Sequence, residues 1–148
     1  MAEIHFREIN GCKYQIEKDS VFDPDDPLYA KVPFIKGYNI TTKYIQLKKN
    51  GKLTLLVGYP WDGASGPTID TKGAIAGSLY HDPIYKLIRM CLLPVSLRKQ
   101  ADKCYKRICI AWKMSRFRAW VHLRVLKRAG KYSAIPGDVK KVRVIRME

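Results

Sequence analysis

A histidine, an aspartate and a tyrosine occupy one short segment, at His81, Asp82 and Tyr85. A histidine can accept a proton near neutral pH, but it works well as a general base only when a second group fixes its tautomer and ring direction. His81 and Tyr85 are four residues apart, so on a helix they project from one face, whereas Asp82 lies about 100° further round. The spacing predicts a general base beside a tyrosine and a carboxylate with a separate role.

A partner for His81 is expected from the segment between Leu97 and Lys113, where apolar residues recur at helical spacing. Asp102 falls at the edge of that apolar face. A carboxylate on a buried face costs several kcal/mol unless a partner binds it. We therefore expect a hydrogen-bonded cluster of His81, Asp102 and Tyr85 between two packed helices. The alternative is structural: Asp102 pairs with a lysine or caps a helix, and His81 is a satisfied core histidine.

The segment from Asp62 to Asp70 contains two glycines, Gly63 and Gly66. Glycines let backbone carbonyls approach a bound ion closely, and calcium takes six to eight oxygen ligands, many of them carbonyls. The sequence therefore predicts a calcium site made by Asp82, Asp62, Gly63 and Gly66. The alternative is a tight turn between a strand and a helix, in which Gly66 and Pro67 serve turn geometry and Asp62 or Asp70 acts as a cap.

Pro83 directly follows Asp82 and interrupts the expected helix. A proline inside a helix removes one hydrogen bond and clashes with the preceding turn. Either the helix that begins near Thr71 kinks at Pro83, or a new helix begins there with Asp82 as its N-cap. In the second case the Asp82 carboxylate would bind backbone N–H groups and would be a poorer calcium ligand.

A series of motifs between about residues 35 and 130 resembles a family common in tailed phages and prophages, domain of unknown function 1353. The motifs are, in order, Val57-Gly58-Tyr59, Asp62-Gly-Ala-Ser-Gly-Pro67, Leu79-Tyr-His-Asp82, Tyr85, Arg98, Ala101-Asp102 and Arg124-Val-Leu-Lys-Arg-Ala-Gly130. This resemblance implies a phage protein and carries no established activity.

A second, more distant resemblance rests on the glycine-containing loop, the His81-Asp82-x-x-Tyr85 motif and the later Ala101-Asp102. This order is similar to phospholipase A2, particularly its short viral and prokaryotic forms. The resemblance implies that His81 activates a water for ester hydrolysis and that Asp102 orients His81, with Tyr85 in support. It also implies that Asp82 and the loop from Asp62 to Gly66 hold calcium, which would polarise the ester carbonyl.

The length and composition indicate a single α+β domain. The chain has 148 residues, of which 47% are hydrophobic, and this is enough to bury a core of its own. We expect residues 1–60 to be mainly β, 61–70 to form the glycine-containing loop, 71–130 to be helical and 131–148 to be a basic tail. The fold should thus begin with an antiparallel hairpin or small sheet and continue with about three packed helices.

Local patterns place the elements. The Asn50-Gly51 turn between two alternating segments predicts a β-hairpin. The first helix is expected from about Thr71 to Leu92; the second is expected to be capped by Ser96 and to reach about Met114. A third should run from Ser115 to Ala129, with Gly130 as its stop, and should bury Phe117, Trp120 and Val121. The segment from Asp138 to Arg146 is expected to be an edge strand or an extended arm.

Positive charge is concentrated in the second half of the sequence. Residues 1–85 contain 10 basic and 10 acidic side chains, whereas residues 86–148 contain 18 and 3. Such a field attracts polyanions, so the expected partners of the C-terminal basic helices are an anionic phospholipid membrane surface or nucleic acid. Aromatic side chains among the arginines could also stack on bases, although at helical spacing they are more often core.

No membrane span and no signal peptide are recognised in the sequence, so synthesis in the cytoplasm of a bacterial host is expected, with association with the virion as a further alternative. The four cysteines lack a metal-ligand spacing and are expected to be reduced thiols.

Two hypotheses follow from these patterns. One is a calcium-dependent, phospholipase A2-like hydrolase of phage origin. The other is a non-enzymatic accessory that contacts virion proteins or nucleic acid and keeps the same cluster as a buried structural network. A metal phosphohydrolase of the histidine-aspartate type is disfavoured, because His5 and His122 stand in no suitable motif.

Overall fold

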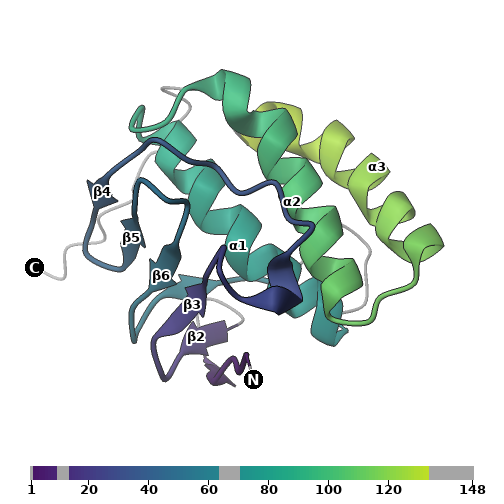
Figure 1. Ribbon diagram of the computed structural model, residues 1–148, viewed down its shortest axis with the longest axis horizontal. Helices are drawn as coiled ribbons and strands as arrows, with labels where there is room; N and C mark the ends of the chain where they lie inside the picture. The colour runs from purple at the N-terminus through teal and green to yellow at the C-terminus, as the bar shows by residue number, and fades with distance from the viewer. Residues whose placement is uncertain (1, 10–13, 64–70, 134–148) are drawn as a thin grey trace, which may run out of the picture.

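Two small antiparallel sheets are followed by three helices in the computed structural model, which confirms the expected α+β class (Figure 1). The structure describes residues 2–9, 14–63 and 71–133, and it describes side chains as far as residue 128. Gly66 and the segment from Asp138 to Arg146, about which the sequence made predictions, lie outside these ranges.

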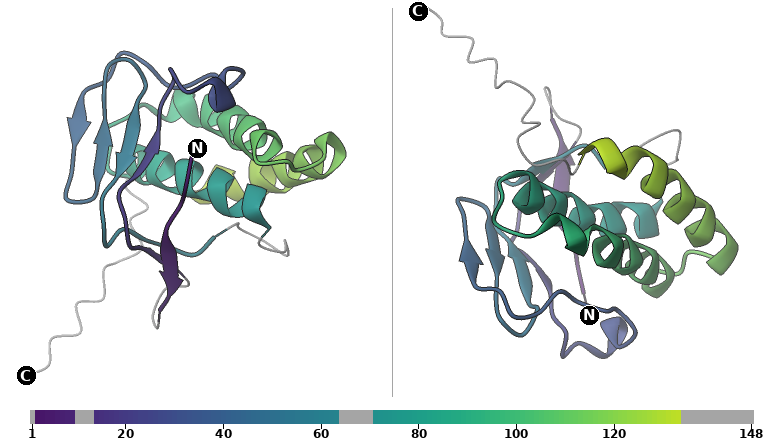
Figure 2. Two further views of the ribbon diagram at one scale, coloured as in Figure 1. Left: turned by 60° about the horizontal axis from the view of Figure 1, so that its bottom comes forward. Right: turned by 90° about the horizontal axis from the view of Figure 1, so that it is seen from above.

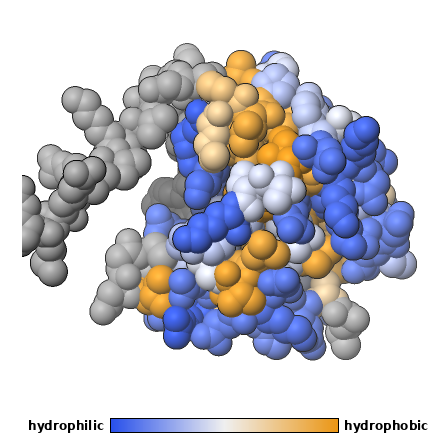
Figure 3. Space-filling model, turned by 90° about the vertical axis from the view of Figure 1, so that its left-hand side faces the viewer, coloured by the Kyte–Doolittle hydropathy of each residue, from blue (hydrophilic) through white to orange (hydrophobic). Residues whose placement is uncertain are grey.

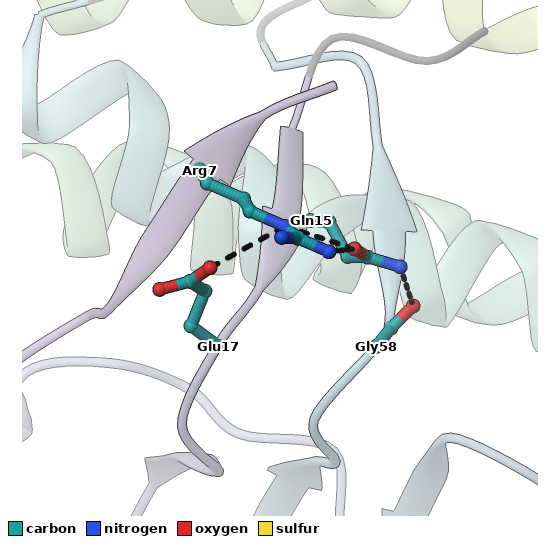
Figure 4. A network of polar contacts seen from close by, with 4 residues as sticks. All are labelled: Arg7, Gln15, Glu17 and Gly58. Carbon is teal, nitrogen blue, oxygen red and sulfur yellow. Dashed lines mark hydrogen bonds and ion pairs between the residues drawn. The ribbon is translucent and has the colours of Figure 1, made fainter. Parts of the chain in front are cut away.

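The first sheet has the strand order β1-β2-β7. Its strands are β1 (Phe6–Glu8), β2 (Tyr14–Ile16) and β7 (Pro60–Trp61). Polar contacts cross its outer surface, as Figure 4 shows: Arg7 pairs with Glu17 and donates to the Gln15 side chain, which itself donates to the Gly58 carbonyl. The sheet thereby fixes β7, the strand that leads into Asp62.

The second sheet has the strand order β3-β6-β5-β4. Its strands are β3 (Ser20–Phe22), β4 (Ile40–Thr41), β5 (Ile45–Leu47) and β6 (Leu53–Leu55), and the 3-10 helix η1 (Pro27–Tyr29) follows β3. Strands β5 and β6 pair antiparallel with Leu47 opposite Leu53. Gly51 takes a φ of 94°, which its missing side chain permits. The predicted Asn-Gly hairpin is therefore confirmed.

The helices are α1 (Lys72–Arg89), α2 (Arg98–Ala111) and α3 (Arg116–Ser133), with the 3-10 helix η2 (Val95–Leu97) before α2. Helices α1 and α2 pack together and share the main hydrophobic core with both sheets. Helix α3 packs on α2 on the side remote from the sheets (Figures 1 and 2). The α1–α2 interface is therefore interior, whereas α3 has an outward face.

Several predicted helix boundaries were wrong. Helix α1 ends at Arg89 rather than near Leu92, and α2 ends at Ala111 rather than near Met114. Ser96 does not cap α2, because η2 intervenes and the N-cap position falls on Leu97. Gly130 does not end α3, which continues to Ser133. A single glycine costs a helix only about 1 kcal/mol, so it does not by itself fix the end.

The predicted inner face of α3 was also wrong. Phe117, Trp120 and Val121 are exposed, at 75%, 46% and 37% of their surface. The residues that face α2 are a different set at helical spacing: Ala119, His122, Leu123 and Leu126. Of these, Ala119 and Leu126 join a second core cluster that includes Tyr105 and Cys109 of α2.

The surface carries separate apolar patches between hydrophilic side chains, as Figure 3 shows for the left-hand face of Figure 1. Exposed apolar residues include Met90, Leu92 and Val95 in the connection between α1 and α2. Among the helices of the described ranges, none is both long and apolar enough to cross a bilayer. Cys91, Cys104 and Cys109 are free cysteines, and Cys12 lies outside the described residues.

Candidate active site

His81, Asp102 and Tyr85 meet at the interface between α1 and α2. The Nε2 atom of His81 lies 2.7 Å from Oδ1 of Asp102, and the Tyr85 hydroxyl donates to the same oxygen at 2.6 Å. All three side chains are buried, with 5%, 1% and 3% of their surface exposed. The hydrogen-bonded cluster expected from the sequence is thus present. Two short hydrogen bonds compensate for the burial of the Asp102 carboxylate.

The close approach of α1 to α2 depends on small residues in the first half of α1. A Cβ atom at Gly77 would lie 2.6 Å from the Cys109 sulfur and 3.1 Å from the Tyr105 ring, and one at Gly73 would lie 2.9 Å from the Cys109 carbonyl oxygen. These glycines let the two helices pack closely enough for His81 to reach Asp102. The spacing Gly73-x-x-x-Gly77 was the sequence signal for this contact, and it was overlooked.

The hydrogen bonds determine which nitrogen of His81 can act as a base. An ionised Asp102 can only accept hydrogen bonds, so in neutral His81 the proton must be on Nε2. The lone pair is then on Nδ1, the atom available to accept a proton. The pKa of Tyr85 is raised well above its ordinary value, by burial first and then by its hydrogen bond to Asp102 and the charge there. Tyr85 therefore remains a neutral donor.

Aromatic rings hold the His81 ring in place. Tyr85 lies beside it with a centroid distance of 4.0 Å, and Tyr105 of α2 meets it edge-on at 5.6 Å. Tyr105 also hydrogen-bonds through its hydroxyl to Nδ1 of His122, at 2.9 Å. The pKa of His122 is lowered, by burial first and then by the charge of Arg118. This hydrogen bond links His122 of α3 to the cluster, a role that sequence reasoning did not assign to it.

Asp82 is not the N-cap of a new helix, which rules out that alternative. Helix α1 continues through Pro83, and its N-cap is Thr71, whose hydroxyl accepts from the backbone N–H of Ala74. Proline removes one N–H, so the Leu79 carbonyl loses its usual partner while the helix persists. Strong packing of α1 on both sides compensates for this loss. The Asp82 carboxylate is therefore not used for capping.

Asp62 is brought near Asp82 by an anchored tryptophan. The indole N–H of Trp61 in β7 donates to the Ser78 hydroxyl at 3.2 Å, and that hydroxyl donates to the Ile75 carbonyl. Ser78 and Asp82 are four residues apart in α1 and share one face. Asp62 follows Trp61 directly, and its charge acts on Asp82.

Burial and Asp62 together disfavour the charged form of Asp82. The pKa of Asp82 is raised from 3.8 to about 6, chiefly by burial; His81 and Arg89 oppose the rise and Asp62 adds to it. A nearby cation would relieve this penalty, and carboxylate oxygens are the donors that calcium prefers. Gly63, buried with a φ of 79°, follows Asp62.

The described part of the site fits calcium by donor type, although it does not make a full ligand shell. Within the described ranges, no group of three or more histidine, cysteine, aspartate or glutamate side chains could hold a metal ion. The described candidates for calcium ligands are the carboxylates of Asp62 and Asp82 and the backbone of Gly63. Gly66, the fourth predicted contributor, lies outside the described residues.

No protein-family model, curated protein or solved structure matches this chain.

Proposed function

We propose that the chain is a phage-encoded, calcium-dependent ester hydrolase that works in the manner of phospholipase A2. The observation that carries the proposal is the shared hydrogen bonding of His81 and Tyr85 to one oxygen of Asp102. This arrangement presents Nδ1 of His81 as a base. His81 and Asp82 are adjacent in α1, so the proposed base and the proposed calcium ligand come from neighbouring positions of one helix.

The residues of the chain divide the chemistry between them. Nδ1 of His81 accepts a proton from a water molecule as that water attacks an ester carbonyl, and the imidazolium so formed donates its Nε2–H to Asp102. As the acyl C–O bond breaks, Nδ1 returns its proton to the departing alkoxide oxygen, which leaves an alcohol and a carboxylic acid. Tyr85 and Asp102 hold the ring in one orientation through the reaction. Asp82 and Asp62 supply the negative charge that would hold calcium. When bound, calcium would supply Lewis-acid stabilisation to the developing oxyanion.

A non-enzymatic function is the second candidate, and the burial of the cluster favours it. His81 is only 5% exposed and Asp102 only 1%, which is also what a satisfied structural network would give. In that case the protein is a virion component or a nucleic-acid-binding accessory. Its partners would then be other virion proteins or nucleic acid, reached through the basic helices.

Hydrolysis of phosphatidylglycerol vesicles distinguishes the two candidates. The purified protein is assayed for fatty acid release with calcium, with a chelator, and with magnesium added back after chelation. The hydrolase should release fatty acid only with calcium, because magnesium demands a compact octahedral shell that a carbonyl-rich loop does not provide. Absence of release from folded protein in all three conditions contradicts the hydrolase and supports the structural alternative.

A further inference from the structure

The outward face of α3 combines apolar and basic side chains in one stripe. Phe117, Trp120 and Val121 are exposed and stand at positions i, i+3 and i+4 of the helix, with Arg124 and Arg128 continuing the same side at i+7 and i+11. The core-facing residues Ala119 and Leu126 occupy the opposite side. We call this set, Phe117, Trp120, Val121, Arg124 and Arg128, the α3 outer stripe.

The charge around the stripe is of one sign. Helix α3 contains no acidic residue, and as far as residue 128 its exposed basic side chains are Arg116, Arg118, Arg124, Lys127 and Arg128. On α2 the single acidic residue is Asp102, which is buried and already bonded to His81 and Tyr85. The basic side chains of α3 therefore have no acidic neighbour on their own helix, and an anionic partner would be favoured.

The aromatic side chains of the stripe are organised on the surface without being covered. Phe117 and Trp120 stack with centroids 6.2 Å apart, and the Arg124 guanidinium lies 5.1 Å from the centroid of the Trp120 ring. Trp and Phe with flanking arginines are what an interfacial helix presents, because the rings enter the boundary of headgroups and acyl chains while the long basic side chains reach the phosphates.

We propose that the α3 outer stripe docks the protein on an anionic lipid bilayer, with α3 lying along the membrane plane. The helix lies at the edge of the molecule, on the side of α2 remote from the sheets, so its outer side is accessible to a flat surface (Figures 1 and 2). The inference goes beyond the proposed hydrolysis: it names a binding surface and a partner, and binding to it requires neither turnover nor calcium.

A lipid surface fits the stripe better than the two other occupants. Base stacking would use the aromatic rings, but Arg124 already lies over the Trp120 ring, and stacking would leave the apolar Val121 exposed. A second copy of the chain would bring the same basic helix against itself, with like charges opposed. An anionic bilayer satisfies the arginines and the apolar rings together.

Vesicle binding tests the proposal, and tryptophan fluorescence reports it at the stripe. The protein is mixed with vesicles of phosphatidylglycerol and phosphatidylcholine, or of phosphatidylcholine alone, always with a chelator so that hydrolysis plays no part. Trp61 is buried and Trp112 is half-buried, so a blue shift of emission on binding should come mainly from Trp120. We expect co-sedimentation and a blue shift with the anionic vesicles, and at least about tenfold weaker binding to the neutral ones.

Two variants with a matched control localise the binding. The double variant Phe117→Ser/Trp120→Ser should bind anionic vesicles at least about tenfold more weakly, and Arg124→Gln/Arg128→Gln should lose most of the preference for anionic lipid. Val57→Ser, an exposed apolar residue on the opposite part of the fold, should bind as the wild type does. All changed side chains are exposed, so each variant should keep its circular dichroism spectrum.

Four outcomes would overturn the proposal. The first is unchanged vesicle binding by the Phe117→Ser/Trp120→Ser variant. The second is displacement of the protein from vesicles by a single-stranded oligonucleotide, together with an affinity for that oligonucleotide that depends on the α3 outer stripe. The third is a wild-type dimer in light scattering that becomes a monomer in the Phe117→Ser/Trp120→Ser variant. Failure of hydrolysis leaves all these readouts intact, because none depends on His81. A fourth outcome, absence of vesicle binding by the wild type while it still hydrolyses dispersed short-chain esters, would overturn the docking surface alone.

Discussion

Replacing Asp82 by asparagine is expected to stabilise the calcium-free protein near neutral pH. The pKa of Asp82 is raised from 3.8 to about 6, chiefly by burial. An acid whose pKa is higher in the folded state opposes folding once it is ionised, so the wild type loses stability as pH rises from about 4 through about 6. At about 1.4 kcal/mol per pH unit, the shift in the pKa of Asp82 corresponds to a loss of about 3 kcal/mol in the free energy of unfolding above neutral pH.

Urea unfolding of wild type and Asp82→Asn measures this effect when the two are compared at about pH 4 and about pH 7.5 with a chelator present. Asparagine has nearly the same shape and no charge, so the difference in free energy of unfolding should be small at the lower pH. At the higher pH the variant should be more stable by about 1 to 3 kcal/mol, the lower value allowing for the residual solvent contact of Asp82. Asp25→Asn, which removes an exposed carboxylate, is the control and should show a much smaller change.

Calcium should remove or reverse this difference in stability. A ligand at about 100 times its dissociation constant stabilises the folded state by about 2.7 kcal/mol, and Asp82→Asn should lose most of that gain while Asp25→Asn keeps it. A variant that is less stable than the wild type at neutral pH, or a difference that does not change with pH, would refute the electrostatic reasoning. Equal calcium stabilisation of both proteins would remove Asp82 from the metal site.

Three further predictions follow from the α1–α2 interface. Asp102→Asn should reduce hydrolysis by about 10²- to 10⁴-fold in steady-state assays, because the amide no longer fixes the His81 proton on Nε2. Unchanged turnover would exclude a catalytic pairing of His81 with Asp102. Gly77→Ala should lower the free energy of unfolding by about 1 to 3 kcal/mol in urea, since its Cβ would meet the Cys109 sulfur at 2.6 Å, and a neutral effect would show that α2 yields easily. Burial raises the pKa of Cys104 and of Cys109 to about 12, so mass spectrometry after brief alkylation of the native protein should find exposed Cys91 modified and these two unmodified.

The cluster of His81, Asp102 and Tyr85 could be predicted because each step rested on a strong local rule. The four-residue spacing placed His81 and Tyr85 on one face, and a buried carboxylate on a neighbouring helix needed partners. The hairpin at Asn50-Gly51 was equally local, since the turn type follows from the backbone freedom of glycine. The catalytic role of these residues stays a prediction.

The orientation of α3 could not be predicted because the helix carries two competing apolar stripes. Phe117, Trp120 and Val121 are larger and more apolar than the set that is buried, so a hydrophobicity argument chose them. The buried side instead includes Ala119, whose small size permits close packing on α2, and His122, which finds a specific partner in the Tyr105 hydroxyl. Such complementarity depends on what the neighbouring helix presents, and this is not visible in the periodicity of one segment.

Pro83 illustrates a tertiary effect that overrides a local one. In isolation, a proline at this position favours a helix break, and both interpretations of the sequence assumed a kink or a restart. Helix α1 runs without a break from Lys72 to Arg89, which excludes the restart, and it is buried along most of its length between the sheets and α2. Packing of this extent outweighs the loss of one backbone hydrogen bond.

The most direct test of the proposed hydrolase compares calcium-dependent fatty acid release by the wild type, His81→Ala and His5→Ala. His5 is an exposed histidine whose hydrogen bond is to Glu3, so its variant controls for loss of a histidine outside the cluster. If His81 is the base, His81→Ala should lose release while its circular dichroism spectrum is preserved, and His5→Ala should retain full activity. Release by folded His81→Ala at the wild-type rate would contradict the proposed mechanism.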